Sequence, residues 1–348
     1  MFTGPGLVMP REHVCEVETV SVDASALSSG ELLVENEYSV VSAGTEVAVF
    51  TGLAPGVRVL GSWCAYPFRP GYGAVGRVVA VGRPPVRQLG PIPDERDRVF
   101  AITCHARFAV ADLKYPVIRI REDDDAKTLV LARMASIAIT AVRKSERVQL
   151  GARAIVIGLG LVGNFAAQLL QLAGMRVLGL DRARHRVEMA TESGLTALEV
   201  NEPVDREQVW AMCGGEGGDV VVEASGVPDA AHLAARLAKD GGDVVLLGSP
   251  RGEFHEDTTE MLRQVHLRGL RIVGALESVL PVRTGKWEAR WSIDNDYKEL
   301  FQLLREGRLK THELVSHVVL PDQAQAIYSR LASDGTSMGA VLFDWRAE

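Results

Sequence analysis

The chain has 348 residues, of which 47% are hydrophobic and 24% charged, and its formal net charge is −7. This composition is typical of a soluble globular protein with material for two domains. The negative net charge gives the protein no overall positive potential that would attract nucleic acid. No segment reaches the ~18 consecutive apolar residues of a membrane helix. The N-terminal segment shows no signal-peptide pattern. We therefore expect a cytoplasmic protein that binds a small molecule and neither nucleic acid nor membrane.

Residues 13–120 are expected to be rich in short strands. The segments HVCEVETVSV, ELLVENEYSVV, GAVGRVVAVG and DRVFAITCHARFAVAD mix apolar and polar residues at near-alternating spacing, as half-buried strands do. Between them lies GLAPGVRVLGSWCAYPFRPGYG, a loop rich in glycine, proline and aromatic residues that suits the lining of a pocket. Trp63 and Arg69 are its candidate substrate contacts, and packing of the loop onto the protein body is the alternative.

After residue 122, strand-like runs alternate with helical segments. AKTLVLARMASIAITAVRKSE has helical spacing without glycine or proline, which predicts one helix. The runs RAIVIG, RVLGLD, DVVVEAS and DVVLLGS predict strands buried on both faces, and LVGNFAAQLLQLAG and PDAAHLAARLAKDGG predict helices between them. This alternation indicates a parallel sheet covered by helices on both faces.

The glycine-rich turn GLGLVG lies between a predicted strand and a predicted helix. Such a turn brings backbone N–H groups and a helix N-terminus close to a pyrophosphate. Asp181 ends the next predicted strand, where a carboxylate accepts from the adenosine ribose and repels a 2′-phosphate. NAD is therefore the expected cofactor, while Arg182 and the arginines after it leave NADP open. The cofactor contacts expected in the turn are Gly158, Gly160, Leu161, Val162 and Gly163.

These motifs, in this order, resemble the medium-chain dehydrogenase/reductase superfamily over nearly the whole chain. The resemblance rests on SAGTE, PGYGAVGRVVAVG, DRVF, the GLGLVG unit, VVEASG, GGDVVLLGS, RIVGAL and LVSHVVLPDQAQAIYSRL. It implies a β-rich, GroES-like catalytic domain (residues 1–122 and 284–348) with an inserted α/β Rossmann domain, a doubly wound parallel sheet (residues 123–283). It also implies a homodimer, and further cofactor contacts from Ala224, Ser225, Gly226, Gly248, Ser249 and Ala275.

Zinc members of that superfamily have a Cys-Gly-Thr-Asp-like segment, a Gly-His-Glu segment and a third ligand that opens a helix. The corresponding segments here read AGTE, GYG and MAS, so Ala43, Tyr72 and Gly73 stand in ligand segments, and the third position falls near Ala135 or Ser136. These residues are poor or impossible zinc ligands, and the four cysteines form no CxxC pair. The chain is thus similar to a zinc-free subgroup that includes bacteriochlorophyllide-type hydroxyethyl dehydrogenases, although Gly73 replaces the glutamate expected there.

Without a Lewis acid, protein groups must handle the proton of the substrate. The resemblance places Thr45 where zinc members hydrogen-bond the substrate oxygen, and Tyr72 in the place of a lost ligand, with a packed aromatic as the alternative. His105 is a third catalytic candidate, with a structural role as its alternative. Glu46 is a candidate substrate contact that would orient Thr45 or act as a base, with a structural salt bridge as its alternative. Met134 and Ser136 complete the candidate substrate contacts.

We therefore expect a zinc-independent, NAD-dependent oxidoreductase. It would interconvert a secondary alcohol, on a polyol, cyclitol, sugar or ring-bearing metabolite, with its ketone. One alternative is an NADPH-dependent enoyl or quinone reductase, against which Asp181 argues. Another is a cofactor-binding protein without turnover, a hypothesis that Ala43 and Gly73 would suit.

Overall fold

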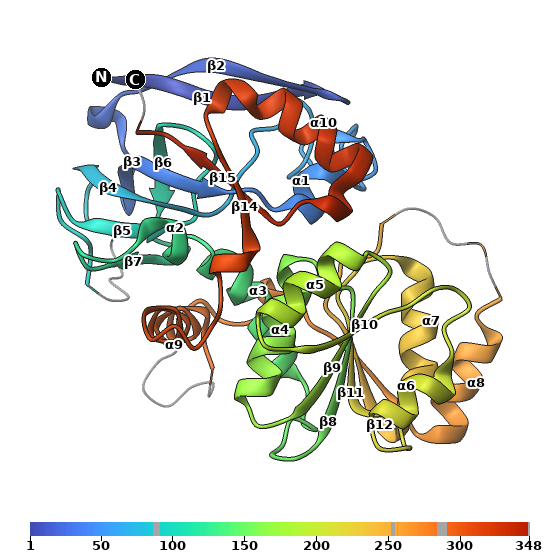
Figure 1. Ribbon diagram of the computed structural model, residues 1–348. Helices are drawn as coiled ribbons and strands as arrows, with labels where there is room; N and C mark the ends of the chain where they lie inside the picture. The colour runs from blue at the N-terminus through green and yellow to red at the C-terminus, as the bar shows by residue number, and fades with distance from the viewer. Residues whose placement is uncertain (86–90, 252–254, 256, 284–290, 347–348) are drawn as a thin grey trace. The chain divides into compact units, whose positions relative to one another are not determined.

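The computed structural model describes residues 1–85, 91–251, 255, 257–283 and 291–346 (Figure 1). Unit 1 comprises Met1–Arg133, Leu280–Glu306 and Val315–Glu348, and unit 2 comprises Met134–Val279 and Gly307–Leu314. The first boundary lies after Arg133 and not at residue 122, because α2 (Ala126–Leu129) packs against β3 (Glu31–Val40) and α9 (Ile293–Arg305) of unit 1. Residue 284, the other expected boundary, lies outside the described residues.

The main sheet of unit 1 combines strands from both ends of the chain. Its order is β14-β15-β3-β4-β5-β7, with β6 also paired to β3, while β1 and β2 form a separate ribbon. β15 runs antiparallel to β3, with Leu342 opposite Val40 (Figure 1). The remaining elements are β1 (Phe2–Arg11), β2 (Val14–Val22), α1 (Ala43–Phe50), β4 (Ala74–Val81), β5 (Arg98–Ala101), β6 (Phe108–Asp112), β7 (Val117–Arg119), β14 (Val315–Val319), α10 (Ala324–Asp334) and β15 (Ala340–Asp344).

The core of unit 1 joins α1 to the C-terminal elements. Phe50 of α1 stacks on Tyr328 of α10 with ring centroids 5.7 Å apart, and Phe343 and Trp345 pack in the same apolar cluster. All four side chains are almost completely buried. The burial of such large aromatic surfaces fixes α1 against β15 and α10, although these segments are almost 300 residues apart in sequence.

Unit 2 is a parallel sheet of order β10-β9-β8-β11-β12-β13, which is the doubly wound order of dinucleotide-binding folds. Figure 1 shows α4 and α5 on one side of this sheet and α6, α7 and α8 on the other. The elements are α3 (Ala132–Lys144), which starts at the boundary, β8 (Arg153–Ile157), α4 (Leu161–Leu172), β9 (Arg176–Asp181), α5 (Arg184–Glu192), β10 (Thr196–Glu199), α6 (Arg206–Met212), β11 (Gly218–Glu223), α7 (Pro228–Leu237), β12 (Ala238–Leu246), α8 (Thr259–Arg268) and β13 (Arg271–Gly274).

Two helix predictions need correction. The segment predicted as one helix forms α2 and α3, because Leu131 and Arg133 donate to the third residue back and tighten the turn between them. The helix predicted over residues 228–242 ends at Leu237, because Ala238 is extended and pairs with Gly218 as the start of β12. In the described part of the chain, no helix has the length and apolar character needed to cross a membrane.

Candidate active site

Three hydroxyl groups of unit 1 lie together at the start of α1. The Tyr72 hydroxyl donates to Oγ of Ser42, which precedes the helix, and lies 3.4 Å from Oγ1 of Thr45. Burial raises the pKa of Tyr72, and this effect exceeds the lowering by Arg133 and by the two hydroxyls. The phenol therefore carries its proton near neutral pH and can donate it. The structure thus brings together Thr45 and Tyr72, two of the three predicted catalytic residues.

The residues in the ligand segments do not suit zinc. Ala43 is the first residue of α1, and Gly73 precedes β4, so neither side chain offers a donor atom. Tyr72 supplies one phenolic oxygen, whereas zinc sites in proteins use Cys, His, Asp and Glu. Ala135 and Ser136 are buried in α3. Within the described ranges, no three residues of those zinc-binding types are grouped as a metal site would require.

A buried set of hydrogen bonds adjoins the hydroxyl cluster through Glu46. Its Oε1 accepts from the Ser42 N–H at 2.9 Å, and its Oε2 accepts from the Tyr328 hydroxyl at 2.5 Å. Nε2 of His105 lies 3.1 Å from the same Oε2, and Nδ1 of His105 lies 2.7 Å from Oγ of Ser39. All of these side chains except Ser42 have an exposed fraction of 0%. The carboxylate therefore holds the start of α1 and the His105 ring at once.

The partners fix the direction of two bonds in this set. Nε1–H of Trp345 can only donate, and it donates to Oγ of Ser39 at 2.8 Å. The Glu46 carboxylate accepts, so Nε2–H of His105 donates to it, whereas the direction of the bond between Nδ1 and Ser39 depends on the tautomer of His105. Both ring nitrogens are thus occupied inside unit 1. The structure places His105 with Glu46 and not with the hydroxyls of Thr45 and Tyr72.

Two glycines flank Tyr72, and each makes room for a functional neighbour. A Cβ at Gly71 would lie 2.5 Å from the backbone nitrogen of His105, and a Cβ at Gly73 would lie 2.6 Å from Cγ of Arg133. The Arg133 guanidinium lies over the Tyr72 ring, 4.7 Å from its centroid. Sequence reasoning missed Arg133. The signal that could have found it is the missing side chain at Gly73, which leaves space for a large residue from elsewhere.

The loop predicted to line the substrate entrance has one free aromatic residue. Trp63 is 67% exposed and meets Phe68 edge-on, with ring centroids 6.2 Å apart. Tyr66 donates its hydroxyl to the Val49 carbonyl, and the Phe68 ring packs against the core of unit 1. Arg69 bonds Glu18 at 2.7 and 3.2 Å. Trp63 is therefore the aromatic residue of this loop with an exposed surface for a ligand, while Arg69 is paired with a carboxylate.

The other two expected substrate contacts are buried in α3. Met134 is 2% exposed and Ser136 is 1% exposed. Both belong to unit 2, and their expected contact with the substrate stays a prediction.

The phosphate-binding turn of unit 2 has the backbone that its sequence predicts. Gly158 follows β8 with φ 89°, and a Cβ on it would lie 2.9 Å from Ser225. A Cβ on Gly163 would lie 1.8 Å from the Gly158 carbonyl oxygen, so both positions require glycine. Gly160 immediately precedes α4, whose first residues are Leu161 and Val162. The N–H groups at the start of this helix fit a dinucleotide pyrophosphate.

Asp181, at the end of β9, supports the same turn. Its Oδ2 accepts from the Leu159 N–H at 2.7 Å and its Oδ1 from the Ala183 N–H at 2.8 Å. Arg182 is paired with Glu202 and lies 3.5 Å from Asp229. The arginine next to Asp181 is therefore already engaged by two carboxylates.

A second loop meets the turn at the switch point of the sheet, between β8 and β11. Glu223 ends β11, and its Oε1 accepts from the N–H groups of Ser225 at 2.7 Å and Gly226 at 3.0 Å. Burial raises the pKa of Glu223, and these hydrogen bonds partly oppose that shift. Gly226 has φ 71°, and a Cβ on it would lie 2.5 Å from the Ser249 carbonyl oxygen. The loops following β11, β12 and β13 carry the other predicted cofactor contacts, Ala224, Ser225, Gly226, Gly248, Ser249 and Ala275.

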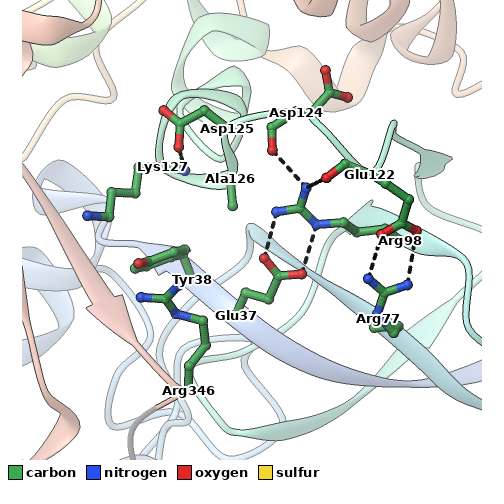
Figure 2. Close-up of a pocket in the computed structure, with 10 residues that line it drawn as sticks. All are labelled: Glu37, Tyr38, Arg77, Arg98, Glu122, Asp124, Asp125, Ala126, Lys127 and Arg346. Atoms are coloured by element: carbon green, nitrogen blue, oxygen red, sulfur yellow. Dashed lines mark hydrogen bonds and ion pairs between the residues drawn. The ribbon is translucent and has the colours of Figure 1, made fainter.

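A cavity of about 440 Å³ in unit 1 lies among ion pairs (Figure 2). Arg98 bonds both carboxylate oxygens of Glu37, at 2.8 and 2.7 Å, and Arg346 lies over the Tyr38 ring. We interpret these contacts as structural, because the lining charges are largely held in ion pairs: Arg77 pairs with Glu122, and Asp124 and Arg346 pair with residues outside the lining. The lining residues are Glu37, Tyr38, Arg77, Arg98, Glu122, Asp124, Asp125, Ala126, Lys127 and Arg346.

Comparisons with known proteins agree on the class of protein. Residues 162–291 match a family described as zinc-binding dehydrogenase. The curated D-guloside 3-dehydrogenase of Shigella flexneri is 28% identical over 210 residues, which are 59% of this chain and 57% of that relative. The chain thus matches little more than half of the relative's length.

Solved structures share the fold over nearly the whole chain. The 2R,3R-butanediol dehydrogenase of Bacillus subtilis has a TM-score of 0.79 at 15% identity, over 98% of this chain and 99% of that one. Benzyl alcohol dehydrogenase from Acinetobacter calcoaceticus has a TM-score of 0.80 at 15% identity, over 99% of both chains. At this identity the likeness shows the fold, which is a Rossmann domain with a GroES-like partner.

Proposed function

The chain belongs to the medium-chain dehydrogenase/reductase superfamily, and from this premise we propose that it is an NAD-dependent oxidoreductase that works without zinc. It interconverts a secondary alcohol and its ketone. The observation that carries the proposal is the cluster of Ser42, Thr45 and Tyr72 hydroxyls, which lies in the two segments that correspond to the zinc-ligand segments of other members. Hydroxyl donors can bind a substrate oxygen and supply its proton.

The cofactor would be held by unit 2. Gly160 and the start of α4 suit its pyrophosphate, and the Asp181 carboxylate suits the ribose and repels a 2′-phosphate. The pairing of Arg182 with Glu202 and Asp229 supports NAD over NADP, because the arginine charge is already matched. The nicotinamide, when bound, exchanges a hydride with the substrate carbon.

The residues of unit 1 bind the substrate oxygen and exchange a proton with it. In the reducing direction, the Tyr72 O–H bond breaks and an O–H bond forms on the substrate oxygen, and solvent later restores the phenol proton. Oxidation of the alcohol is the reverse, with the alcohol proton passing to the phenolate. Thr45 and Ser42 hold the phenol oxygen, and Glu46 fixes the residues around them. His105 and Tyr328 in turn hold Glu46, and His105 serves as a positioning residue in this scheme.

A polyol, sugar, cyclitol or ring-bearing alcohol is the proposed substrate class. The relative named D-guloside 3-dehydrogenase supports a sugar-like secondary alcohol. Trp63 offers an exposed aromatic face, which suits a sugar or an aromatic ring. We also propose that the enzyme is a cytoplasmic homodimer that acts on small molecules; light scattering of the purified protein tests the dimer.

The experiment that tests this function is a turnover screen of NAD and NADP against alcohols, ketones and enones. We expect NAD-linked oxidation of at least one secondary alcohol and reduction of its ketone. NADPH-linked reduction of enones without alcohol activity would replace the proposal by a C=C reductase. Nucleotide binding with no turnover in any pairing would identify a binding protein instead.

A further inference from the structure

Arg133 is a buried cation beside the proposed proton donor. Its side chain is 9% exposed, and its guanidinium lies over the Tyr72 ring at 4.7 Å. Nη1 also donates to the Tyr297 hydroxyl at 3.3 Å. Tyr297 is fully buried against Phe100, with ring centroids 4.7 Å apart. The guanidinium therefore joins the hydroxyl cluster, through Tyr72, to a side chain fixed in the core, Tyr297.

The position of Arg133 depends on Gly73. With any side chain at residue 73, the first carbon would lie 2.6 Å from Cγ and 2.8 Å from Cβ of Arg133. The glutamate that the resemblance leads one to expect there would therefore collide with Arg133. The absence of a side chain at Gly73 therefore leaves the space that the Arg133 side chain occupies.

We propose that Arg133 is a positioning residue whose fixed positive charge holds the Tyr72 ring and favours transfer of the Tyr72 proton to a substrate oxygen. The catalytic part of this proposal rests on the proposed function. When the proton leaves, negative charge develops on the phenol oxygen. A guanidinium stays charged at all working pH values and, where water is scarce, stabilises a nearby anion strongly. Arg133 would thus supply in unit 1 a positive charge that a zinc ion supplies in other members.

The charges around Tyr72 make this role measurable. Burial raises the pKa of Tyr72 most, and Arg133 is the largest of the effects that lower it. The hydroxyls of Ser42 and Thr45 also lower this pKa, whereas Glu46 raises it. Arg133 is thus the cation that offsets the burial of the phenol, and its removal should move the titration of Tyr72 to higher pH.

The test is a fluorine NMR titration of the protein carrying 3,5-difluorotyrosine, whose more acidic phenol titrates within reach. The chain has 6 tyrosines, and Tyr72→Phe identifies the Tyr72 signal. We expect Arg133→Met to move the midpoint of that signal to higher pH and Arg133→Lys to move it less. Gly73→Ala, which displaces the arginine, should act in the same direction as Arg133→Met. Arg346→Met is the matched control, because Arg346 lies 4.5 Å from the Tyr38 ring and should affect the Tyr38 signal only.

The second test of this role is a measurement of kcat and KM in the Arg133 variants. Arg133→Met should lower kcat about tenfold or more, with a smaller effect on KM, but should have little further effect in a Tyr72→Phe background. An unchanged Tyr72 midpoint in Arg133→Met, with a folded circular dichroism spectrum, would overturn the role of Arg133 whatever the activity. So would equal losses of kcat in the two backgrounds. Failure of every cofactor and substrate pair would overturn the proposed function instead, since the NMR titration needs no substrate.

Discussion

Nε2 of His105 and Oε2 of Glu46 lie 3.1 Å apart, and neither side chain is exposed to solvent. The same carboxylate accepts from Tyr328 of α10 and from the backbone of Ser42. A single buried carboxylate thus connects α10 and the loop that carries His105 to the start of α1. Its loss should affect both the stability of unit 1 and the geometry of the hydroxyl cluster.

We first predict that Glu46→Gln lowers the free energy of unfolding by about 3 kcal/mol, because buried donors lose a charged acceptor. Urea denaturation followed by circular dichroism measures this. Glu18→Gln is the control, since the Glu18–Arg69 pair is partly exposed, and it should cost less than about 1 kcal/mol. Equal effects of the two substitutions would contradict the structural importance of Glu46.

The second prediction concerns the hydroxyl cluster. Tyr72→Phe should lower kcat by roughly 10²-fold, because it removes the proposed proton donor while keeping the ring. Thr45→Val should lower kcat in the same direction. The affinity for NAD, measured by calorimetry without substrate, should stay unchanged, because the proposed dinucleotide contacts lie in unit 2. A Tyr72→Phe enzyme with normal kcat would remove Tyr72 from the mechanism.

The third prediction separates two roles of the glycine-rich turn. A Cβ at Gly160 would meet no protein atom closer than 3.8 Å, whereas a Cβ at Gly163 would lie 1.8 Å from the Gly158 carbonyl oxygen. Gly160→Ala should therefore keep the thermal midpoint but weaken NAD binding, since the pyrophosphate must approach this backbone closely. Gly163→Ala should lower both. Calorimetry and thermal unfolding provide the two measurements, and normal NAD affinity in Gly160→Ala would argue against this binding mode.

The fourth prediction is a pH dependence of stability from Cys15. Burial, aided by Glu46, raises the pKa of the Cys15 thiol from 9.0 to about 12. Between these values the unfolded chain has lost the thiol proton while the folded chain retains it. The stabilisation is thus complete below pH 9 and is lost as the pH rises towards 12. Cys15→Ala should flatten the fall of unfolding free energy over this range in urea titrations. Parallel curves for the two proteins would show that Cys15 does not contribute.

The fifth prediction concerns metal content. Ala43, Tyr72 and Gly73 do not supply zinc ligands, so the purified protein should contain far less than one zinc per chain. Dialysis against EDTA should leave the NAD-linked turnover unchanged. Elemental analysis before and after dialysis measures both points. One tightly bound zinc per chain, lost together with activity, would falsify the zinc-free proposal.

Much of unit 2 could be predicted from sequence because its signals are local. The run before Gly158 and the glycines of the turn each constrain their own backbone, and the structure confirms the parallel sheet and the Rossmann fold. The end of α7 was predicted wrongly because Ala238 has good helix propensity, whereas its pairing with Gly218 in the sheet decides its conformation. Local preference was overridden there by a tertiary contact.

The candidate site also combines features that follow from local sequence with features that depend on tertiary contacts. The sequence alone determined the resemblance to the superfamily, the phosphate-binding turn and the absence of ligand side chains at Ala43 and Gly73, because each motif involves residues close together in the chain. Only the tertiary structure decided that His105 joins Glu46 and that Arg133 covers Tyr72. The first pair is separated by 59 residues, and in both pairs one partner lies in a helix and the other in a loop. No local pattern encodes such a contact, since it forms only when these segments pack together.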